Sequence, residues 1–368
     1  MSTREPAADL GAQSGSTSRT GEHPDRAVGW RPIAAGPLVA GFTLVAALVV
    51  TAQADFTFRD PDHVAALYVV EVGAGVALLV WLDIFLRARR LTGKRRPSRE
   101  AMGTVRRERW TPKRMAAVAG AIVAFYVTYL AYRNLKAAVP LLRPGDLFDR
   151  QLAEIDQAMF FGSDPAVLLH DLLGTGISAD ILSTFYVAFI VFLPLSLGLA
   201  LVFAERLQVG LVYATALSIN WVLGAASYFL LPALGPIYYD PATFSVLPHT
   251  EVAGLQELLM DDRVRFLANT DTGTPQAIAA FASLHIAMSF TALLAAYMLN
   301  LGRRVKQALW AWLALSFLAT IYLGWHYVLD DVAGMLIGAA ALVLARMLTG
   351  FDPARTCTRG PAFGGPSR

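Results

Sequence analysis

Three pairs of polar residues, far apart in the chain, have the side chains that phosphate chemistry needs. The pairs are Lys136 with Arg143, Ser283 with His285, and His326 with Asp330. A lysine offers phosphate a point charge, and the planar fork of an arginine binds two phosphate oxygens at once. A histidine can attack phosphorus or pass a proton to a leaving oxygen near neutral pH. Together these residue types predict a site that binds and transfers a phosphoryl group.

The spacing within the second and third pairs adds geometry. Ser283 and His285 begin an apolar run, and a helix N-terminus has unpaired N–H groups that suit an anion. His326 and Asp330 are four residues apart and therefore share a helix face. Asp330 could accept a hydrogen bond from one ring nitrogen of His326 and leave the other as a nucleophile or base. Asp331 points elsewhere, and we expect it to be a first-turn acid favoured by the helix dipole.

Each pair also has an interpretation without chemistry. The two cations could be side chains at the headgroup level of a membrane, with their stems in the apolar layer. Ser283 could cap a helix beside an incidental histidine. The third pair could be a hydrogen bond at the membrane interface. The catalytic interpretation is favoured if all three pairs lie on one face of a membrane, where ionisable groups are costly without a function.

The composition indicates a membrane protein. Of the 368 residues, 55% are hydrophobic and only 16% are charged, and the mean hydropathy is +0.49. The apolar residues gather in runs of about 20, the length at which a helix crosses a bilayer. We predict eight spans, at roughly 33–54, 64–86, 115–135, 181–203, 209–231, 278–299, 308–323 and 328–348. The expected fold is therefore an all-α polytopic membrane protein in which the last six spans form a core.

The basic residues set the orientation of the spans. Lysines and arginines are concentrated in residues 87–114, and the positive-inside rule makes that loop cytoplasmic. This topology explains the pI near 9.0, so no nucleic-acid partner is expected. An even number of spans returns both termini to the cytoplasm. All three polar pairs then lie on the extracytoplasmic face, and we expect the membrane to be the plasma membrane.

The chain divides into five expected parts. These are a disordered cytoplasmic tail at 1–29, a transmembrane helix pair at 30–86, the basic cytoplasmic loop at 87–114, a six-helix catalytic core at 115–348 and a cytoplasmic tail at 349–368. Residues 1–29 are polar and lack an apolar stretch, which is typical of disorder. Two long outer segments contain parts with an amphipathic rhythm, at 149–160 and 251–266, and such helices can lie on a bilayer surface.

The three pairs resemble the motifs of the type 2 phosphatidic acid phosphatase superfamily. Residues 136–144 fit the first motif, Lys-x6-Arg-Pro, in full. The second motif is Pro-Ser-Gly-His, and residues 282–285 keep its serine and histidine but not its proline or glycine. The third motif is Ser-Arg-x5-His-x3-Asp, in which Ala319 and Thr320 stand where Ser-Arg would be. The lost arginine removes one expected phosphate ligand.

Both departures are similar to one branch of that superfamily, the fungal inositol phosphorylceramide synthases and related bacterial proteins. In that branch Ser-Leu-His and His-Tyr-x2-Asp are usual, and residues 283–285 and 326–330 have these forms. The resemblance covers about 115–348 and leaves out the N-terminal helix pair.

The resemblance implies a two-step mechanism without a metal or other cofactor. His326 would attack phosphorus and form a phosphohistidine, Asp330 would orient it, and His285 would protonate the leaving alkoxide. The phosphate oxygens would be held by Lys136, Arg143 and Ser283. The implied partner is a membrane lipid phosphoester, and water or the alcohol of a lipid or glycan would then accept the phosphoryl group.

The residues leave two enzymatic interpretations open and one of another class. The first is a lipid phosphotransferase, with a phosphoinositol-type head group as one candidate. The second is a simple lipid phosphate phosphatase acting on phosphatidic acid or a polyprenyl phosphate, since both activities use the same residues. The third is a transporter or flippase that binds anionic lipid at the basic outer site.

Three more ionisable residues were considered for the site. Glu71 lies inside the second span, where we expect it to pair with Arg133. His170 and His249 lie in the outer segments and could line the pocket. Their spacing is not that of a metal site, and the single cysteine, Cys357, excludes an intramolecular disulfide.

Overall fold

A computed structural model describes residues 29–60, 64–271, 273–275 and 278–353. The expected tails at 1–29 and 349–368, including Cys357, fall almost entirely outside these residues. Within the described part, every regular element is a helix, and seven segments are long and apolar enough to cross a membrane. The expectation of an all-α polytopic membrane fold is confirmed.

The spanning segments follow the predicted order along the chain. They are α1 (Trp30–Gln53), α2 (Val64–Thr92), α4 (Pro112–Leu142), α7 with α8 (Ile177–Val187 and Phe189–Phe203), α9 (Leu207–Leu230), α14 (Arg303–Tyr322) and α15 (Val328–Thr349). The remaining predicted span is α13 (Leu284–Met298), which is apolar but has only 15 residues. Residues 278–283 have no regular secondary structure, so α13 begins at residue 284 and not at 278 as predicted.

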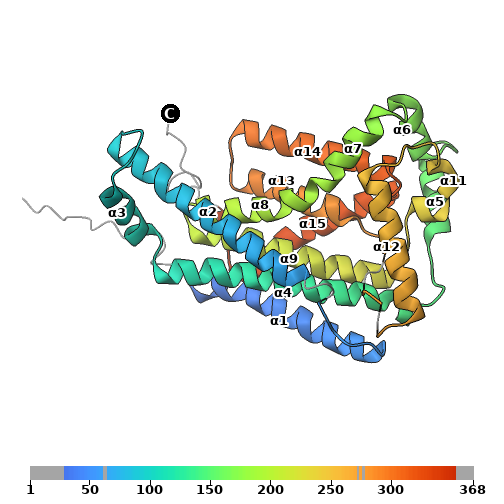
Figure 1. The fold of residues 1–368 in the computed structure, drawn as a ribbon, viewed down its shortest axis with the longest axis horizontal. Coiled ribbons are helices and arrows are strands. Elements are labelled where there is room, and N and C mark those ends of the chain that lie inside the picture. The colour runs from blue at the N-terminus through green and yellow to red at the C-terminus, as the bar shows by residue number, and fades with distance from the viewer. Residues whose placement is uncertain (1–28, 61–63, 272, 276–277, 354–368) are drawn as a thin grey trace, which may run out of the picture.

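The connections differ between the two ends of the bundle (Figure 1). One end has the basic helix α3 (Arg99–Arg109). The opposite end, which we call the long-loop end, has the short helices α5 (Asp149–Met159), α6 (Pro165–Leu173), α10 (Pro236–Tyr239), α11 (Pro241–Phe244) and α12 (Glu251–Ala268). The two segments with an amphipathic rhythm are therefore helices, α5 and α12.

α9 forms the centre of the bundle. It contacts α1, α4, α8, α13 and α15. In its most apolar 18-residue stretch 83% of the residues are buried, compared with 6% in that of α2. A helix that is apolar all round is typical of such a central position. α1 packs on both α4 and α9, so the first helix of the N-terminal pair is part of the core, whereas α2 lies at its edge.

Two glycines bring α13 and α15 into backbone contact. A Cβ atom added at Gly334 would lie 2.4 Å from the carbonyl oxygen of Ser283, and one at Gly338 would lie 2.4 Å from that of Ala287. Small residues four apart allow this close approach between membrane helices. The backbone N–H of Ser283 also donates a 3.0 Å hydrogen bond to the carbonyl oxygen of Asp330. The beginnings of α13 and α15, which carry the second and third polar pairs, are thus held side by side.

Candidate active site

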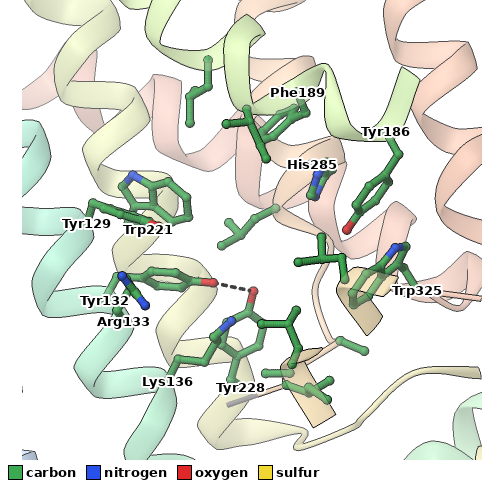
Figure 2. Close-up of a pocket in the computed structure, with 18 of the residues that line it drawn as sticks. Tyr129, Tyr132, Arg133, Lys136, Tyr186, Phe189, Trp221, Tyr228, His285 and Trp325 are labelled. Atoms are coloured by element: carbon green, nitrogen blue, oxygen red, sulfur yellow. Dashed lines mark hydrogen bonds between the residues drawn. The ribbon is translucent and has the colours of Figure 1, made fainter. Parts of the chain in front are cut away.

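A cavity of about 340 Å³ lies among the helices and reaches residues of the long-loop end, and three of the predicted site residues line it. They are Lys136 of α4, His285 of α13 and His326, which directly precedes α15. The rest of the described wall is largely apolar and includes ten aromatic residues. Nine of these come from α2, α4, α7, α8 and α9, with Tyr68, Tyr129, Tyr132, Tyr186, Phe189 and Trp221 among them. Figure 2 shows Tyr132, Arg133 and Lys136 on one side of this cavity and His285 with Tyr186 on the other.

His326 is paired with Asp330 as the spacing predicts. The Nδ1 atom of His326 lies 3.4 Å from Oδ2 of Asp330, and the same oxygen accepts a 3.0 Å hydrogen bond from the backbone N–H of Tyr327. Asp330 is fully buried. Because Nδ1 faces the carboxylate and the ring lines the cavity, Nε2 is the nitrogen available to a substrate.

Aromatic rings hold His285 in place. Its ring stacks on that of Tyr186, with centroids 4.3 Å apart, and lies 4.1 Å from the centroid of Phe189. The ring of Trp325 also stacks on that of Tyr186, in a nearly parallel arrangement with centroids 5.4 Å apart. This packing restricts the imidazole to one plane and presents its edge to the cavity (Figure 2).

Ser283 lies behind the cavity rather than on its surface. It is fully buried as the N-cap residue of α13, and it is absent from the residues that line the cavity. Its Oγ lies near the carboxylate of Asp331, which is also fully buried. A direct contact with a substrate phosphate would therefore require the start of α13 to move.

Arg143 lies in a different cavity from Lys136. α4 runs to Leu142, and Arg143 lines a neighbouring cavity of about 300 Å³ together with Arg263. Its Nε donates to Asp146 at 2.8 Å, and its Nη1 donates to the carbonyl oxygen of Phe229 at 2.6 Å. The structure thus brings Lys136 to both histidines but does not bring Arg143 to them.

The second cation of the main cavity is Arg133, one helical turn before Lys136. Its side chain is more than nine-tenths buried, and its Nη1 atom has no hydrogen-bond partner among the described residues. Lys136 Nζ lies 5.8 Å from the ring centroid of Tyr132. The sequence predicts Arg133 as a partner of Glu71 and not as a site residue. The signal for a site residue is its spacing of three from Lys136, which places both cations on one helix face.

The family model of the PAP2 superfamily matches residues 150–344, more than half of the chain. The chain belongs to the PAP2 superfamily. No curated protein and no solved structure matches it. The PAP2 match includes Ser283, His285, His326 and Asp330, and it begins after Arg133 and Lys136. Membership in the PAP2 superfamily and the seven apolar helices are consistent with a membrane protein of lipid phosphatase type.

One departure from the PAP2 motifs has a structural counterpart. Thr320 occupies the position of the motif arginine, and its Oγ1 donates a 2.8 Å hydrogen bond to Oδ2 of Asp331. Asp331 is fully buried. It is therefore more than a first-turn acid that favours the helix dipole, because it ties the end of α14 to the start of α15.

The other ionisable residues of interest lie outside the cavity. Glu71 is exposed on α2 and has no ion pair with Arg133 among the residues described. His170 is buried, with Nε2 2.9 Å from the carbonyl oxygen of Tyr322, and His249 is exposed beside Glu257. In the part of the chain that the structure describes, no three acidic, histidine or cysteine side chains are grouped so that they could hold a metal ion.

Proposed function

We propose that this protein is an integral-membrane enzyme that transfers or hydrolyses the phosphoryl group of a lipid phosphoester through a phosphohistidine. The observation that carries the proposal is the convergence of His285, His326 and Lys136 on one cavity with a largely apolar wall, inside a bundle of apolar helices. A charged head and an apolar tail belong to one lipid, and the two kinds of wall in this cavity suit the two parts of such a molecule.

In the first step, His326 attacks the phosphorus atom. A bond forms between Nε2 and phosphorus while the bond from phosphorus to the leaving oxygen breaks. Asp330 accepts the Nδ1–H proton in a hydrogen bond and stabilises the charge that develops on the ring. His285, in its protonated form, gives its proton to the leaving alkoxide.

In the second step, His285 acts as a base instead of an acid. Water or an acceptor alcohol gives its O–H proton to His285 and attacks phosphorus as the bond between phosphorus and Nε2 breaks. Positioning and charge stabilisation account for most of the catalysis of such a transfer. With a phosphomonoester donor, water gives free phosphate and an alcohol gives a new phosphomonoester. With a phosphodiester donor, the group on His326 keeps its other ester bond, so water gives a phosphomonoester and an alcohol gives a new phosphodiester.

We propose that Lys136 and Arg133 bind the phosphate oxygens. The resemblance assigns them to Lys136, Arg143 and Ser283, but Arg143 lines the neighbouring cavity and Ser283 is buried behind the main one. The Nη1 atom of Arg133 has no hydrogen-bond partner among the described residues, which supports a role for Arg133 in place of Arg143 and Ser283. A buried guanidinium N–H without an acceptor is costly unless a ligand supplies one. Ser283 then acts in the contact between α13 and α15.

Two observations favour transfer over hydrolysis. The motif forms Ser-Leu-His and His-Tyr-x2-Asp are similar to those of the inositol phosphorylceramide synthases. The long-loop end also places α12 residues Leu255 and Leu259 on the cavity wall, so that an acceptor head group would meet protein rather than open water. We therefore favour a phosphoinositol-type head group as the group transferred. Simple dephosphorylation of phosphatidic acid or a polyprenyl phosphate is the alternative that PAP2 membership itself favours.

The orientation in the membrane is also part of the proposal. The end of the bundle with α3 carries the basic segment 87–114, and the positive-inside rule makes it cytoplasmic. The long-loop end, from which Leu234, Leu255 and Leu259 line the cavity, then faces the extracytoplasmic side.

The test uses purified protein in detergent with a panel of lipid phosphates and phosphodiesters. Free phosphate and new lipid products are measured together for wild type, His326→Ala and the exposed control His249→Ala. Free phosphate that depends on His326 identifies a phosphatase, and a new phosphodiester with little free phosphate identifies a transferase. Lipid binding that His326→Ala leaves unchanged, without phosphohistidine in the wild type, would instead support a transporter.

A further inference from the structure

The outer helix α5 turns two carboxylates toward the protein interior. Asp149 and Asp156 are each only 4% exposed, although they lie on a short helix at the end of the bundle. They are seven residues apart and therefore on the same face of the helix. The charged pair between them, Arg150 and Glu154, is 62–75% exposed on the other side. Burial of a carboxylate is costly unless it is hydrogen-bonded, so the partners of the two acids are informative.

Asp156 caps the helix that follows His326. Its Oδ2 accepts a 2.8 Å hydrogen bond from the backbone N–H of Val328, and its Oδ1 accepts a longer one, 3.4 Å, from that of Leu329. These are the first two N–H groups of α15, which the helix itself cannot satisfy. Within α15, Asp330 accepts a hydrogen bond from the backbone N–H of the N-cap residue, Tyr327, as in a capping box. Asp156 supplies the acceptors for the next two N–H groups from another part of the chain.

Asp149 joins α5 to two more segments of the site. Its carboxylate accepts hydrogen bonds from the backbone N–H groups of Leu234 and Gly235, at 3.0 and 2.8 Å, and from the hydroxyl of Tyr327 at 3.2 Å. Gly235 has a φ of 106°, and a Cβ atom there would lie 2.5 Å from the carbonyl oxygen of Trp325. The turn at 234–235 is therefore pressed directly against the segment that contains His326.

We propose that Asp149 and Asp156 are positioning residues that fix the segment 324–330, and with it the His326–Asp330 pair, relative to the cavity. The proposal rests on the proposed function insofar as it concerns catalysis. Neither acid lines the cavity, so they act through the backbone that they hold. Small errors in the position of a nucleophile are costly because the reacting atoms must meet within about 3–3.5 Å.

The test compares Asp156→Ala with Asp156→Asn and with the control Glu154→Ala from the exposed face of the same helix. Hydrogen exchange is measured for peptides that cover residues 324–331, with peptides from α9 as an internal reference. We expect the fastest exchange at Val328 and Leu329 in Asp156→Ala, and a rate between that and the wild type in Asp156→Asn, whose amide oxygen keeps one acceptor. Glu154→Ala and the α9 peptides should exchange as in the wild type.

The catalytic arm measures the rate of phosphohistidine formation and KM for the same variants. Loss of an outer residue that orients a reactive group typically costs about 10–100-fold, and we expect a loss of that order in turnover for Asp156→Ala with KM changed by less than about 3-fold. Asp149→Ala should give the same pattern. Unchanged exchange at 324–331, or an equal loss in Glu154→Ala, would overturn the proposal. A wild type that never forms phosphohistidine would overturn the proposed function, while the exchange measurement would still decide whether α5 holds the segment.

Discussion

One oxygen atom of Asp330 serves both the imidazole of His326 and the backbone N–H of Tyr327, at 3.4 and 3.0 Å. The carboxylate is thus fixed by the turn that precedes α15 and reaches back to orient the ring in front of it. The orientation of the proposed nucleophile is therefore built into the start of one helix.

Replacing Asp330 by asparagine should test this relationship. The side chain keeps its volume, but it can no longer stabilise the positive ring, and its NH₂ group can favour the wrong tautomer of His326. We expect turnover to fall by at least about 100-fold while the protein still folds. Phosphohistidine formation in a rapid-quench assay is the direct measurement. Asp261→Asn, on the exposed face of α12, is the control and should retain full activity.

Arg133→Gln should reduce activity far more than Arg143→Gln if the phosphate lies in the main cavity. A hydrogen bond between charged groups contributes about 1.5–3 kcal/mol, so removal of the Arg133 guanidinium should lower kcat/KM by about 10- to 100-fold. Arg143→Gln should lower it by less than about 3-fold. The reverse result would return the role to Arg143 and would mean that the two cavities join when substrate binds.

Paired histidine roles predict a bell-shaped dependence of kcat/KM on pH. His326 must be unprotonated to attack, whereas His285 must carry the proton that it gives to the leaving group. Initial rates should be measured across pH 4 to 9 with a buffer series of constant ionic strength. A profile that only rises or only falls over that range would argue against one of the two roles.

The carboxyl group of Asp156 should make stability depend on pH. Burial raises its pKa from 3.8 to about 6, against the opposing effect of its hydrogen bonds from the backbone N–H groups of Val328 and Leu329. Because the folded pKa is above the unfolded one, the fold favours the protonated form. Its stabilising contribution is fully present below about pH 4 and is lost as the pH rises through 6.

Thermal unfolding in detergent at pH 4, 5, 6 and 7 can measure this contribution. Asp156→Asn does not titrate, so the midpoint of the wild type should fall relative to that of the variant between pH 4 and 6. A constant difference between the two midpoints would mean that the pKa of the carboxyl group is not shifted by folding.

Substitution of Gly338 by alanine should separate α13 from α15. The added Cβ would lie 2.4 Å from the carbonyl oxygen of Ala287, which is backbone and cannot move aside. We expect a destabilisation of about 1–3 kcal/mol, measured as a lower unfolding midpoint. Gly75→Ala on α2, where nothing lies within 4 Å of the added atom, should leave the midpoint unchanged or raise it.

Hydropathy and charge predicted the helical membrane fold, since the length of an apolar run directly limits what it can form. The motifs also predicted that Lys136, His285 and His326 share a site. They could not place Arg143, because its position depends on where α4 ends and on the local partners Asp146 and Phe229. Seven residues along a helix correspond to roughly 10 Å, which is enough to move a side chain from one cavity to the next.

The part played by α5 was hidden for a different reason. Its amphipathic pattern indicated a helix on the bilayer surface, and the acids on its inner face look like ordinary polar residues in the sequence. The hydrogen bond between Asp156 and Val328 joins residues 172 positions apart. Local patterns carry no signal for a backbone N–H whose acceptor comes from such a distance.

The walls of the cavity come from two separate stretches of the gene. The histidines lie within residues 150–344, whereas Tyr68, Phe125, Tyr129 and Tyr132 are encoded before that stretch. The part of the aromatic wall that α2 and α4 supply can therefore change in sequence without a change in either histidine. Related chains that share the histidines are expected to diverge in α2 and α4, and hybrids exchanged at about residue 150 would show whether lipid preference is inherited from the first half.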